Sequence, residues 1–382
     1  MSHFTEEIME TELEKERDRK KIETIPLYGT PPTEWGFPPD HVKQAAKDEI
    51  DNPRLHPLEG MLELREAIGK RLESVNKVEM DPRTEIMTVP ATMYALNCAM
   101  TLLLNPGDQA LFYTPSYLFS ANVERVGGIP VYVPTKEQDG FEYDAQALER
   151  NVDRRRTKLI VICNPNNPTG YVPTRQDLEE VAEIATKYDL FVLEDAIYDQ
   201  LIYDGINYAG SIAQFPNMKE RTLIAWSASK SMAMSHFRIG FLAGPEAIIK
   251  SALKLRRYSI IYLPSVSERA LLAALTGPQG WLTEVLKRWQ ESRDMFCYGL
   301  AKINHIACVK PKATSFIYPN ISATGLDDLG MYRYLYVNGL EVRPGIACSD
   351  FQHTNVRINL GGTRENIQRW LERFKGLIEI LE

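Results

Sequence analysis

The chain has 382 residues, of which 44% are hydrophobic and 25% charged, which is ordinary for a globular protein with one large core or two domains. Its net charge of -7 gives no basic footprint, so we expect no nucleic-acid partner. Five scattered cysteines without a C-x-x-C pair, and histidines without a ligand pattern, predict neither disulfides nor a metal site.

The N-terminal part is predicted to be irregular. Residues 1–24 are charged throughout and read as a solvated helix or arm, not as a signal peptide or membrane span, so we expect a cytoplasmic protein. Residues 26–39 carry five prolines and two glycines, which exclude a regular helix and predict an extended crossing. Helical periodicity begins at 60–75.

Short apolar runs rich in β-formers follow, with helical segments such as 174–189 between them. This alternation predicts an α/β fold, with a mostly parallel sheet sandwiched by helices. The predicted strands are 108–114, 129–135, 158–164, 190–196, 222–228 and 238–244.

The pattern changes near residue 270. Helices are predicted at 267–275, 281–303 and 363–381, with short strands before the last one. We therefore expect three parts: an N-terminal arm and small-domain segment (1–45), a large domain (46–270) and a smaller α+β domain (271–382).

Polar residues follow three consecutive predicted strands: Asn167, then Asp195 with Tyr198, then Lys230. Each one alone is compatible with a turn or a helix cap. Because sites in open α/β sheets form at the carboxyl ends of the strands, the three together indicate one functional site.

The segments 164–170, 195–205 and 227–241 resemble the signature segments of the class I/II aminotransferases, and the similarity can be followed from about residue 25 to the C-terminus. The resemblance implies fold-type I, pyridoxal 5'-phosphate (PLP) as cofactor, and a homodimer with shared active sites. Its substrates would be an amino acid and a 2-oxo acid.

The resemblance also implies roles for individual residues. Lys230 matches the lysine that holds PLP as a Schiff base and moves the Cα proton of the substrate. Asp195 matches the carboxylate under the pyridine nitrogen, and Asn167 and Tyr198 match the donors to the 3'-oxygen. Tyr117 matches the aromatic residue that stacks on the ring.

The cofactor phosphate and the substrate would have their own ligands. Arg357 matches the arginine that grips the α-carboxylate, and Gly29 the glycine near the substrate. The residues that match the phosphate site are Arg238, Ser227 and Ser229, with Thr92 and Met93 at the start of a helix whose N-terminus favours an anion.

Four positions depart from the family pattern. Ala91 replaces a glycine, and we expect alanine to be tolerated there only if φ stays negative. His56 replaces a tyrosine that reaches the neighbouring subunit's phosphate; a phosphate donor, a titratable group and a packing residue all remain open. The stretch 256–265 is more apolar than usual, and His236 replaces a glycine.

Three functions are compatible with these residues. The first is an aminotransferase. The second is a PLP-dependent lyase, cyclase or other specialised amino-acid enzyme, and the third a regulator, although only about 25 residues precede the similar part.

The choice of substrate and the interface are open at this stage. The apolar stretches favour a substrate with a neutral or apolar side chain, because Arg256 and Arg257 are expected on a solvent-facing helix surface. The segment around Trp35 is expected at the dimer interface.

Overall fold

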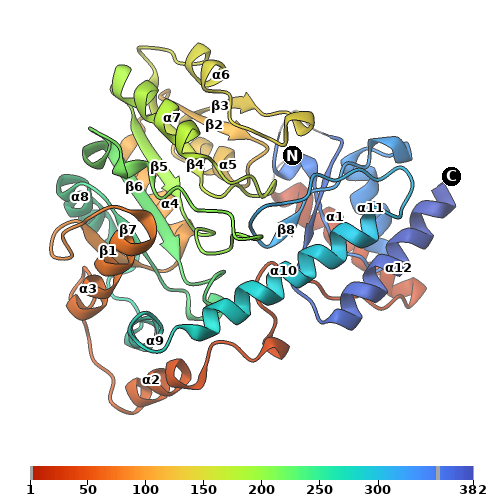
Figure 1. Ribbon diagram of the computed structural model, residues 1–382, viewed down its shortest axis with the longest axis horizontal. Helices are drawn as coiled ribbons and strands as arrows, with labels where there is room; N and C mark the ends of the chain where they lie inside the picture. The colour runs from red at the N-terminus through yellow and green to blue at the C-terminus, as the bar shows by residue number, and fades with distance from the viewer. Residues whose placement is uncertain (1–2, 350–352, 382) are drawn as a thin grey trace.

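The computed structural model describes residues 3–349 and 353–381. It contains a seven-stranded and a three-stranded sheet with helices around them (Figure 1). The helices are α1 (His3–Lys20), α2 (Asp40–Asp51), α3 (Leu62–Arg71), α4 (Thr92–Leu103), α5 (Phe119–Arg125), α6 (Ala145–Arg150), α7 (Arg175–Lys187), α8 (Glu246–Arg256), α9 (Ser265–Thr276), α10 (Gly280–Leu300), α11 (Asp328–Val337) and α12 (Arg364–Leu381). The strands of the large sheet are β1 (Ile86–Val89), β2 (Gln109–Thr114), β3 (Ile129–Pro134), β4 (Thr157–Cys163), β5 (Phe191–Asp195), β6 (Thr222–Ser227) and β7 (Gly240–Ala243).

The large sheet has the order β1-β7-β6-β5-β4-β2-β3. The strands from β6 to β3 pair in parallel, and β7 is antiparallel to both of its neighbours. All six predicted strands are present, so the prediction of a mostly parallel sheet is confirmed. The edge strand β1 was not predicted, because its four residues run directly into the helical pattern of α4.

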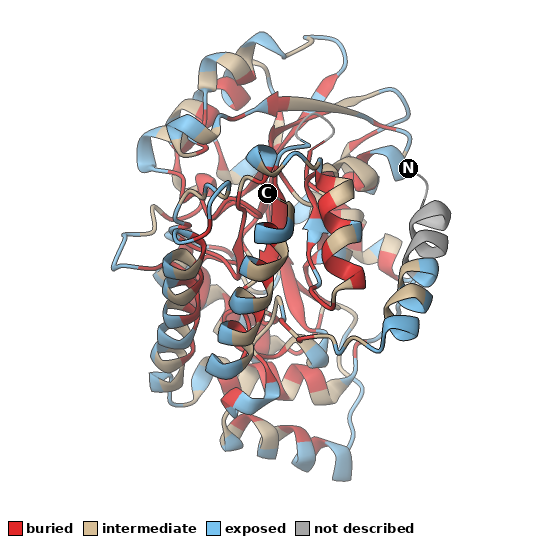
Figure 2. Cartoon of the chain, turned by 90° about the vertical axis from the view of Figure 1, so that its right-hand side faces the viewer, coloured by how far each residue is buried: buried red, intermediate tan, exposed pale blue. Residues whose placement is uncertain are grey.

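Helices cover both faces of this sheet because successive strand residues point to opposite sides. Leu159 and Val161 pack in one apolar cluster with α4, α5 and α8, whereas Ile160 and Ile162 pack in another with α6 and α7. Figure 2 shows the strands as a buried layer between partly exposed helices. A sheet buried on both faces needs continuous apolar strands, which is what the runs in the sequence supply.

The three-stranded sheet has the order β8-β10-β9 and consists of β8 (Phe316–Ile317), β9 (Arg343–Pro344) and β10 (Val356–Asn359). The helix α10 runs from α9 toward it, and α12 packs along α10 (Figure 1). The N-terminal segment joins this part, since the backbones of Tyr28 and Gly361 bond to each other in both directions. The predicted domain boundaries at 45/46 and 270/271 stay predictions. Within the described residues, no helix combines the length and apolar character that crossing a membrane requires.

One expectation from the sequence is wrong, namely the solvent-facing position of Arg256. The indole of Trp35 is buried, packs edge-on against Trp289 at 5.0 Å and donates to Gly362 O at 3.3 Å, so this side chain packs in the core of its own chain, while a dimer interface formed by the segment around it stays a prediction. Arg256 is also buried, and its guanidinium donates to Thr88 O at 2.7 Å and to Ile260 O at 3.1 Å. Trp289, Gly362 and Thr88 are distant in the sequence from the side chains that they contact, whereas Ile260 follows Arg256 by four residues.

Candidate active site

The structure brings together the three polar strand ends. Since β4, β5 and β6 are neighbours in the sheet, Cys163, Asp195 and Ala225 lie side by side at their carboxyl ends. The loops that follow carry Asn167 and Tyr198, and the Asn167 Nδ2 donates to the Tyr198 hydroxyl at 3.4 Å.

Lys230 lies in the turn after β6, and its Nζ donates to the carbonyl of Gly29 at 2.6 Å. Burial, and after it the nearby positive charges of Arg357 and Arg238, lower the pKa of this amine to about 7, while the charge of Asp195 opposes the change. Near neutral pH the amine can therefore both release and accept a proton.

Asp195 is the last residue of β5 and is largely buried. Burial raises the pKa of its carboxyl to about 7, although the Ile197 N–H, which donates to it at 3.2 Å, and the charge of Lys230 favour the ionised form. The protein buries this carboxylate without neutralising its charge. The ionised form would therefore attract a cationic group placed against it.

Arg357, on β10, reaches the strand ends from the smaller sheet. Its side chain is buried, and its guanidinium lies 3.9 Å from the centre of the Tyr117 ring and 4.2 Å from that of Phe316. One nitrogen donates to the Asn167 Oδ1 at 3.3 Å, and the Nε has no hydrogen-bond partner among the described residues. A planar guanidinium that is held between two rings and still has unpaired N–H donors can bind a carboxylate through two parallel hydrogen bonds.

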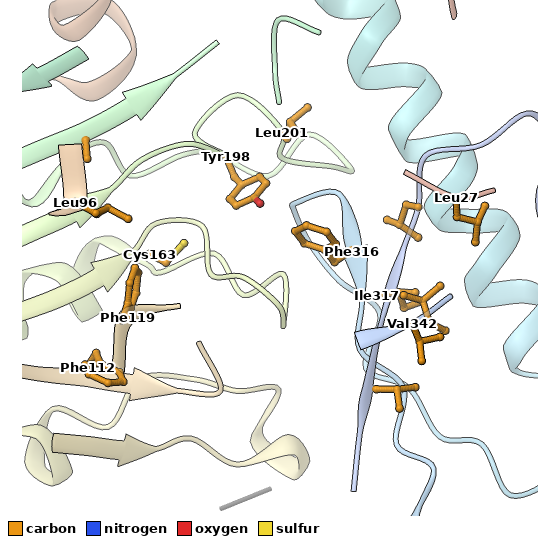
Figure 3. Packing of buried hydrophobic residues seen from close by; sticks show 14 of the residues in the cluster. Leu27, Leu96, Phe112, Phe119, Cys163, Tyr198, Leu201, Phe316, Ile317 and Val342 are labelled. Atoms are coloured by element: carbon orange, nitrogen blue, oxygen red, sulfur yellow. The ribbon is translucent and has the colours of Figure 1, made fainter. Parts of the chain in front are cut away.

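Figure 3 shows Tyr198 and Phe316 facing each other between the large sheet and the smaller one, and their ring centres are 6.1 Å apart. Two sheets thus contribute to one site. The predicted ring-stacking residue, Tyr117, lies against Arg357 in this structure.

Hydroxyl groups gather near the start of α4 and the end of β6. The Ser227 hydroxyl donates to that of Ser229 at 3.2 Å. Thr92 begins α4 with a buried hydroxyl for which the described residues offer no hydrogen-bond partner, and Met93 beside it is exposed. Arg238 is exposed, and one guanidinium nitrogen donates to Ser235 O at 3.0 Å.

The backbone at Ala91 contradicts the expectation of a negative φ. This residue precedes α4 with φ of 73° and ψ of 170°, a conformation that favours glycine because the Cβ of other residues is crowded there. The chain thus keeps the backbone path that a glycine would allow, although it carries an alanine.

These groups fit PLP. The unpaired hydroxyl of Thr92 at a helix N-terminus, the two serines and Arg238 suit a phosphate. Lys230 suits the aldehyde, and Asp195 suits a protonated ring nitrogen. Seven predicted site residues contact one another or act on the charge of Lys230: Gly29, Tyr117, Asn167, Asp195, Tyr198, Arg238 and Arg357. Thr92 and Met93 belong to α4, which packs against β5 and β6.

His56 lies elsewhere in the chain's own structure. Its Nδ1 is 2.6 Å from the Oε2 of the buried Glu268, and its Nε2 has no partner within the described residues. It lines a cavity of about 510 Å³ together with Leu55, Ile261 and Tyr262. The other unusual histidine, His236, is exposed at the turn before β7, and partial burial lowers its pKa.

Sequence analysis missed two neighbours of the site, Ser315 and Phe316, and the carboxylate partner of His56, Glu268. Phe316 begins a short apolar strand, directly after Ser315, with a pattern typical of a core strand, and Glu268 lies in an ordinary helical pattern. No signal in one sequence links them to residues more than 80 positions away.

Comparison with known proteins agrees with this geometry. Residues 28–374 match the family "Aminotransferase class I and II". The chain is 31% identical to aromatic-amino-acid aminotransferase 2 of Thermococcus litoralis over 89% of its length and 88% of that protein's. It is 32% identical to the aspartate aminotransferase of Pyrococcus abyssi, with the same shares of both chains covered.

Solved structures give the same result. The aromatic aminotransferase of Pyrococcus horikoshii OT3 superposes with a TM-score of 0.88 at 31% identity, over 96% of this chain and 99% of that one. A Thermus thermophilus aspartate aminotransferase variant superposes with a TM-score of 0.89 at 28% identity, over 97% and 96%. The chain therefore belongs to the class I and II aminotransferase family and is an aminotransferase that uses pyridoxal 5'-phosphate.

Proposed function

We propose that Lys230 holds PLP as a Schiff base and that this site moves the amino group of an α-amino acid to a 2-oxo acid. The observation that carries the proposal is the amine of Lys230, whose pKa is about 7, among Asp195, Arg357 and Arg238. An amine that is half neutral near pH 7 serves both as nucleophile and as proton carrier.

The residues of the chain would then divide the work. Bound PLP supplies an electron-accepting ring that stabilises negative charge at the substrate Cα. Arg357 binds the α-carboxylate and so orients the amino acid. Lys230 would accept the proton from the substrate Cα and donate it again on the other side of the amino nitrogen. An amine with a pKa of about 7 can both accept and donate a proton near neutral pH.

The remaining predicted residues would hold the cofactor. Asp195 pairs with the protonated ring nitrogen, and its burial strengthens that pair. Asn167 and Tyr198 bind the ring oxygen, and Tyr117 covers the ring. The phosphate would be bound by Thr92 and the backbone at Met93, together with Ser227, Ser229 and Arg238.

We infer that the favoured substrate has an aromatic or apolar side chain. Two rings, Tyr117 and Phe316, flank Arg357, and Arg256 is committed to backbone carbonyls, so it is not available for a second carboxylate. The relatives include both aromatic and aspartate aminotransferases. A higher kcat/KM for phenylalanine than for aspartate supports this inference, and the reverse order would refute it.

We also infer a homodimer. Large apolar side chains are exposed on one surface: Leu55 at 80%, Tyr258 at 91%, Ile261 at 53% and Tyr262 at 49%. A second copy covering this surface would remove them from water. The predicted contact of His56 with the cofactor phosphate of that copy would require the Nε2 of His56, which its own chain buries, to be uncovered. A cytoplasmic location stays a prediction from the N-terminal sequence.

The dimer is tested by sedimentation. The variant Ile261→Asp places a charge in the apolar surface, so we expect monomers where the unmodified chain sediments as a dimer. The matched control is Ile380→Asp, on an exposed site of α12. An unmodified chain that sediments as a monomer would overturn the inference.

The Schiff base is tested by trapping. Protein loaded with PLP and reduced with borohydride should carry one adduct, and peptide mass spectrometry should place it at Lys230. The exposed Lys254 is the control position. Substitution Lys230→Ala should remove both the adduct and turnover, and an adduct at another lysine would refute the assignment.

A further inference from the structure

Asp199 directly follows Tyr198 in the turn after β5, but the two side chains lie on opposite faces of the large sheet. Tyr198 packs in the same apolar cluster as α4, whose N-terminus belongs to the site. One carboxylate oxygen of Asp199 accepts a hydrogen bond from the Trp226 Nε1 at 3.2 Å, and Trp226 packs in the cluster of α2, α3 and α9. The carboxylate of Asp199 therefore lies behind the site, on the face of the sheet opposite α4.

Three donors from three parts of the chain meet at this carboxylate. The Oδ1 accepts from the Arg71 Nη2 at 2.6 Å as well as from Trp226, and the Oδ2 accepts from the Asn76 Nδ2 at 3.1 Å. Arg71 ends α3, Asn76 ends the helical turn that follows α3, and Trp226 belongs to β6. The turn that carries Tyr198 is thereby tied to three neighbouring elements.

A carboxylate suits this position better than any neutral side chain. Both of its oxygens accept, whereas an amide has only one acceptor oxygen and would turn its N–H groups toward a donor on the other side. Asn76 cannot relieve such a conflict by rotating, because its Oδ1 accepts from the Arg71 Nη1 at 3.0 Å. The side chains of Arg71 and Asp199 are only 5% and 0% exposed, so the ion pair is shielded from water. Because apolar residues of similar volume often stabilise a core as well as a buried ion pair does, stability alone does not account for this network.

The turn couples the position of Asp199 to that of Tyr198. It is short and is closed by two backbone hydrogen bonds, from Asp199 N to Ala196 O at 3.1 Å and from Leu201 N to Tyr198 O at 2.8 Å. On the side of the site, the Asn167 Nδ2 reaches the Tyr198 hydroxyl at 3.4 Å, which is long for a hydrogen bond. The buried carboxylate is therefore the stronger of these two constraints on where the tyrosine ring lies.

We propose that Asp199, held by Arg71, is a positioning residue of this site, which fixes the turn after β5 so that the Tyr198 hydroxyl faces the cofactor oxygen. The proposal rests on the function proposed above, because it needs PLP at Lys230. It adds a residue that acts through Tyr198 from the other face of the sheet and touches neither substrate nor cofactor.

The loss of this anchor has a predictable sign. A tyrosine hydroxyl that donates to the ring oxygen of PLP stabilises negative charge there, so the neighbouring Schiff-base nitrogen releases its proton more easily. When Tyr198 is displaced, this donor is weakened and the nitrogen holds its proton more tightly. For a hydrogen bond of ordinary strength, the midpoint of the nitrogen's titration should rise by roughly half a unit to one unit.

The experiment is a pH titration of the visible absorbance of PLP-loaded protein. The test variant combines Arg71→Met with Asp199→Leu, which replaces the ion pair by an apolar pair without a change in net charge, so we expect it to fold. Its midpoint should rise, in the same direction as in Tyr198→Phe. The matched control combines Glu49→Leu with Arg269→Met, an ion pair of 3.2 Å between α2 and α9, and should leave the midpoint unchanged.

A double-mutant cycle separates positioning from a general structural effect. In a Tyr198→Phe background, the apolar pair should produce no further shift, because the hydroxyl through which Asp199 acts is gone. An unchanged midpoint in the apolar pair, or an equal shift in both backgrounds, would overturn the proposal.

A milder variant decides the question if the apolar pair does not fold. Trp226→Phe removes only the donor at 3.2 Å from Asp199 and keeps the ion pair, so we expect a smaller rise of the midpoint. No rise in this variant would equally overturn the proposal. Borohydride trapping on the unmodified chain tests the Schiff base separately, so a missing Lys230 adduct there points to failure of the proposed function itself.

Discussion

Replacement of Arg357 tests the geometry of the site most directly. Arg357→Gln removes the charge and shortens the side chain by two bonds, so the contact with the Asn167 Oδ1 at 3.3 Å is lost as well. Because the Asn167 amide keeps its contact with the Tyr198 hydroxyl, the loss should fall on substrate binding more than on folding.

The size of the effect follows from the contacts. The guanidinium is buried between two rings, and its Nε has no hydrogen-bond partner within the described residues. A substrate carboxylate bound there would interact with a positive charge shielded from water and could accept a hydrogen bond from an unpaired N–H group. Charge-assisted hydrogen bonds contribute about 1.5–3 kcal/mol, which corresponds to a roughly 10- to 150-fold weaker apparent affinity. A second effect is expected on Lys230, because the charge of Arg357 helps to lower its pKa; in the variant that pKa should rise above about 7.

Both effects can be measured. Amino acid is titrated into PLP-loaded protein without a 2-oxo acid, and the change in visible absorbance gives the apparent affinity. The pH dependence of Lys230 acylation in cofactor-free protein, followed by mass spectrometry, gives the pKa of the amine. Arg257→Gln is the control, because Arg257 is exposed and lines the separate cavity of His56. An unchanged affinity in Arg357→Gln, or an equal loss in Arg257→Gln, would remove Arg357 from the substrate site.

Three further outcomes are expected. Ala91→Gly should raise the free energy of unfolding, measured by chemical denaturation, by about 0.5–2 kcal/mol, because relief of the strained backbone at φ of 73° outweighs the extra entropy that glycine has in the unfolded chain. Ala95→Gly, inside α4, is the control and should destabilise the protein. A lower stability of Ala91→Gly would contradict the strain at this position. Asp195→Asn should lower the pKa of Lys230 in the acylation assay, opposite to Arg357→Gln, because the carboxylate raises it; no change would show that the two groups do not interact. The stability of the cofactor-free protein should rise as the pH rises from about 7 toward 10.5, because the unfolded chain keeps the Lys230 proton that the folded chain releases. Lys230→Met should remove up to about a few kcal/mol of that rise. Identical pH profiles of stability for the unmodified chain and Lys230→Met would refute the lowered pKa.

Much of the large sheet followed from local pattern. Its parallel strands are buried on both faces, so they need continuous apolar runs, and such runs stand out between helical segments. The short edge strand β1 was missed because four residues carry too little periodicity before α4 begins. The burial of Arg256 and Trp35 depended on partners in other elements, and composition around each residue could not reveal them.

The sequence by itself determined that the segments carrying Asn167, Asp195 and Lys230 meet, because these residues end or closely follow three strands whose parallel pairing places their carboxyl ends along one edge. Only the tertiary structure decided which groups face them from elsewhere. The approach of the smaller sheet and the N-terminal segment places Arg357, Gly29 and Ser315 against Lys230 and its neighbours, across sequence separations that no local pattern encodes. The burial that this approach creates moves the pKa values of Lys230 and Asp195 to about 7, because desolvation disfavours both charges, and that depends on the packed fold as a whole.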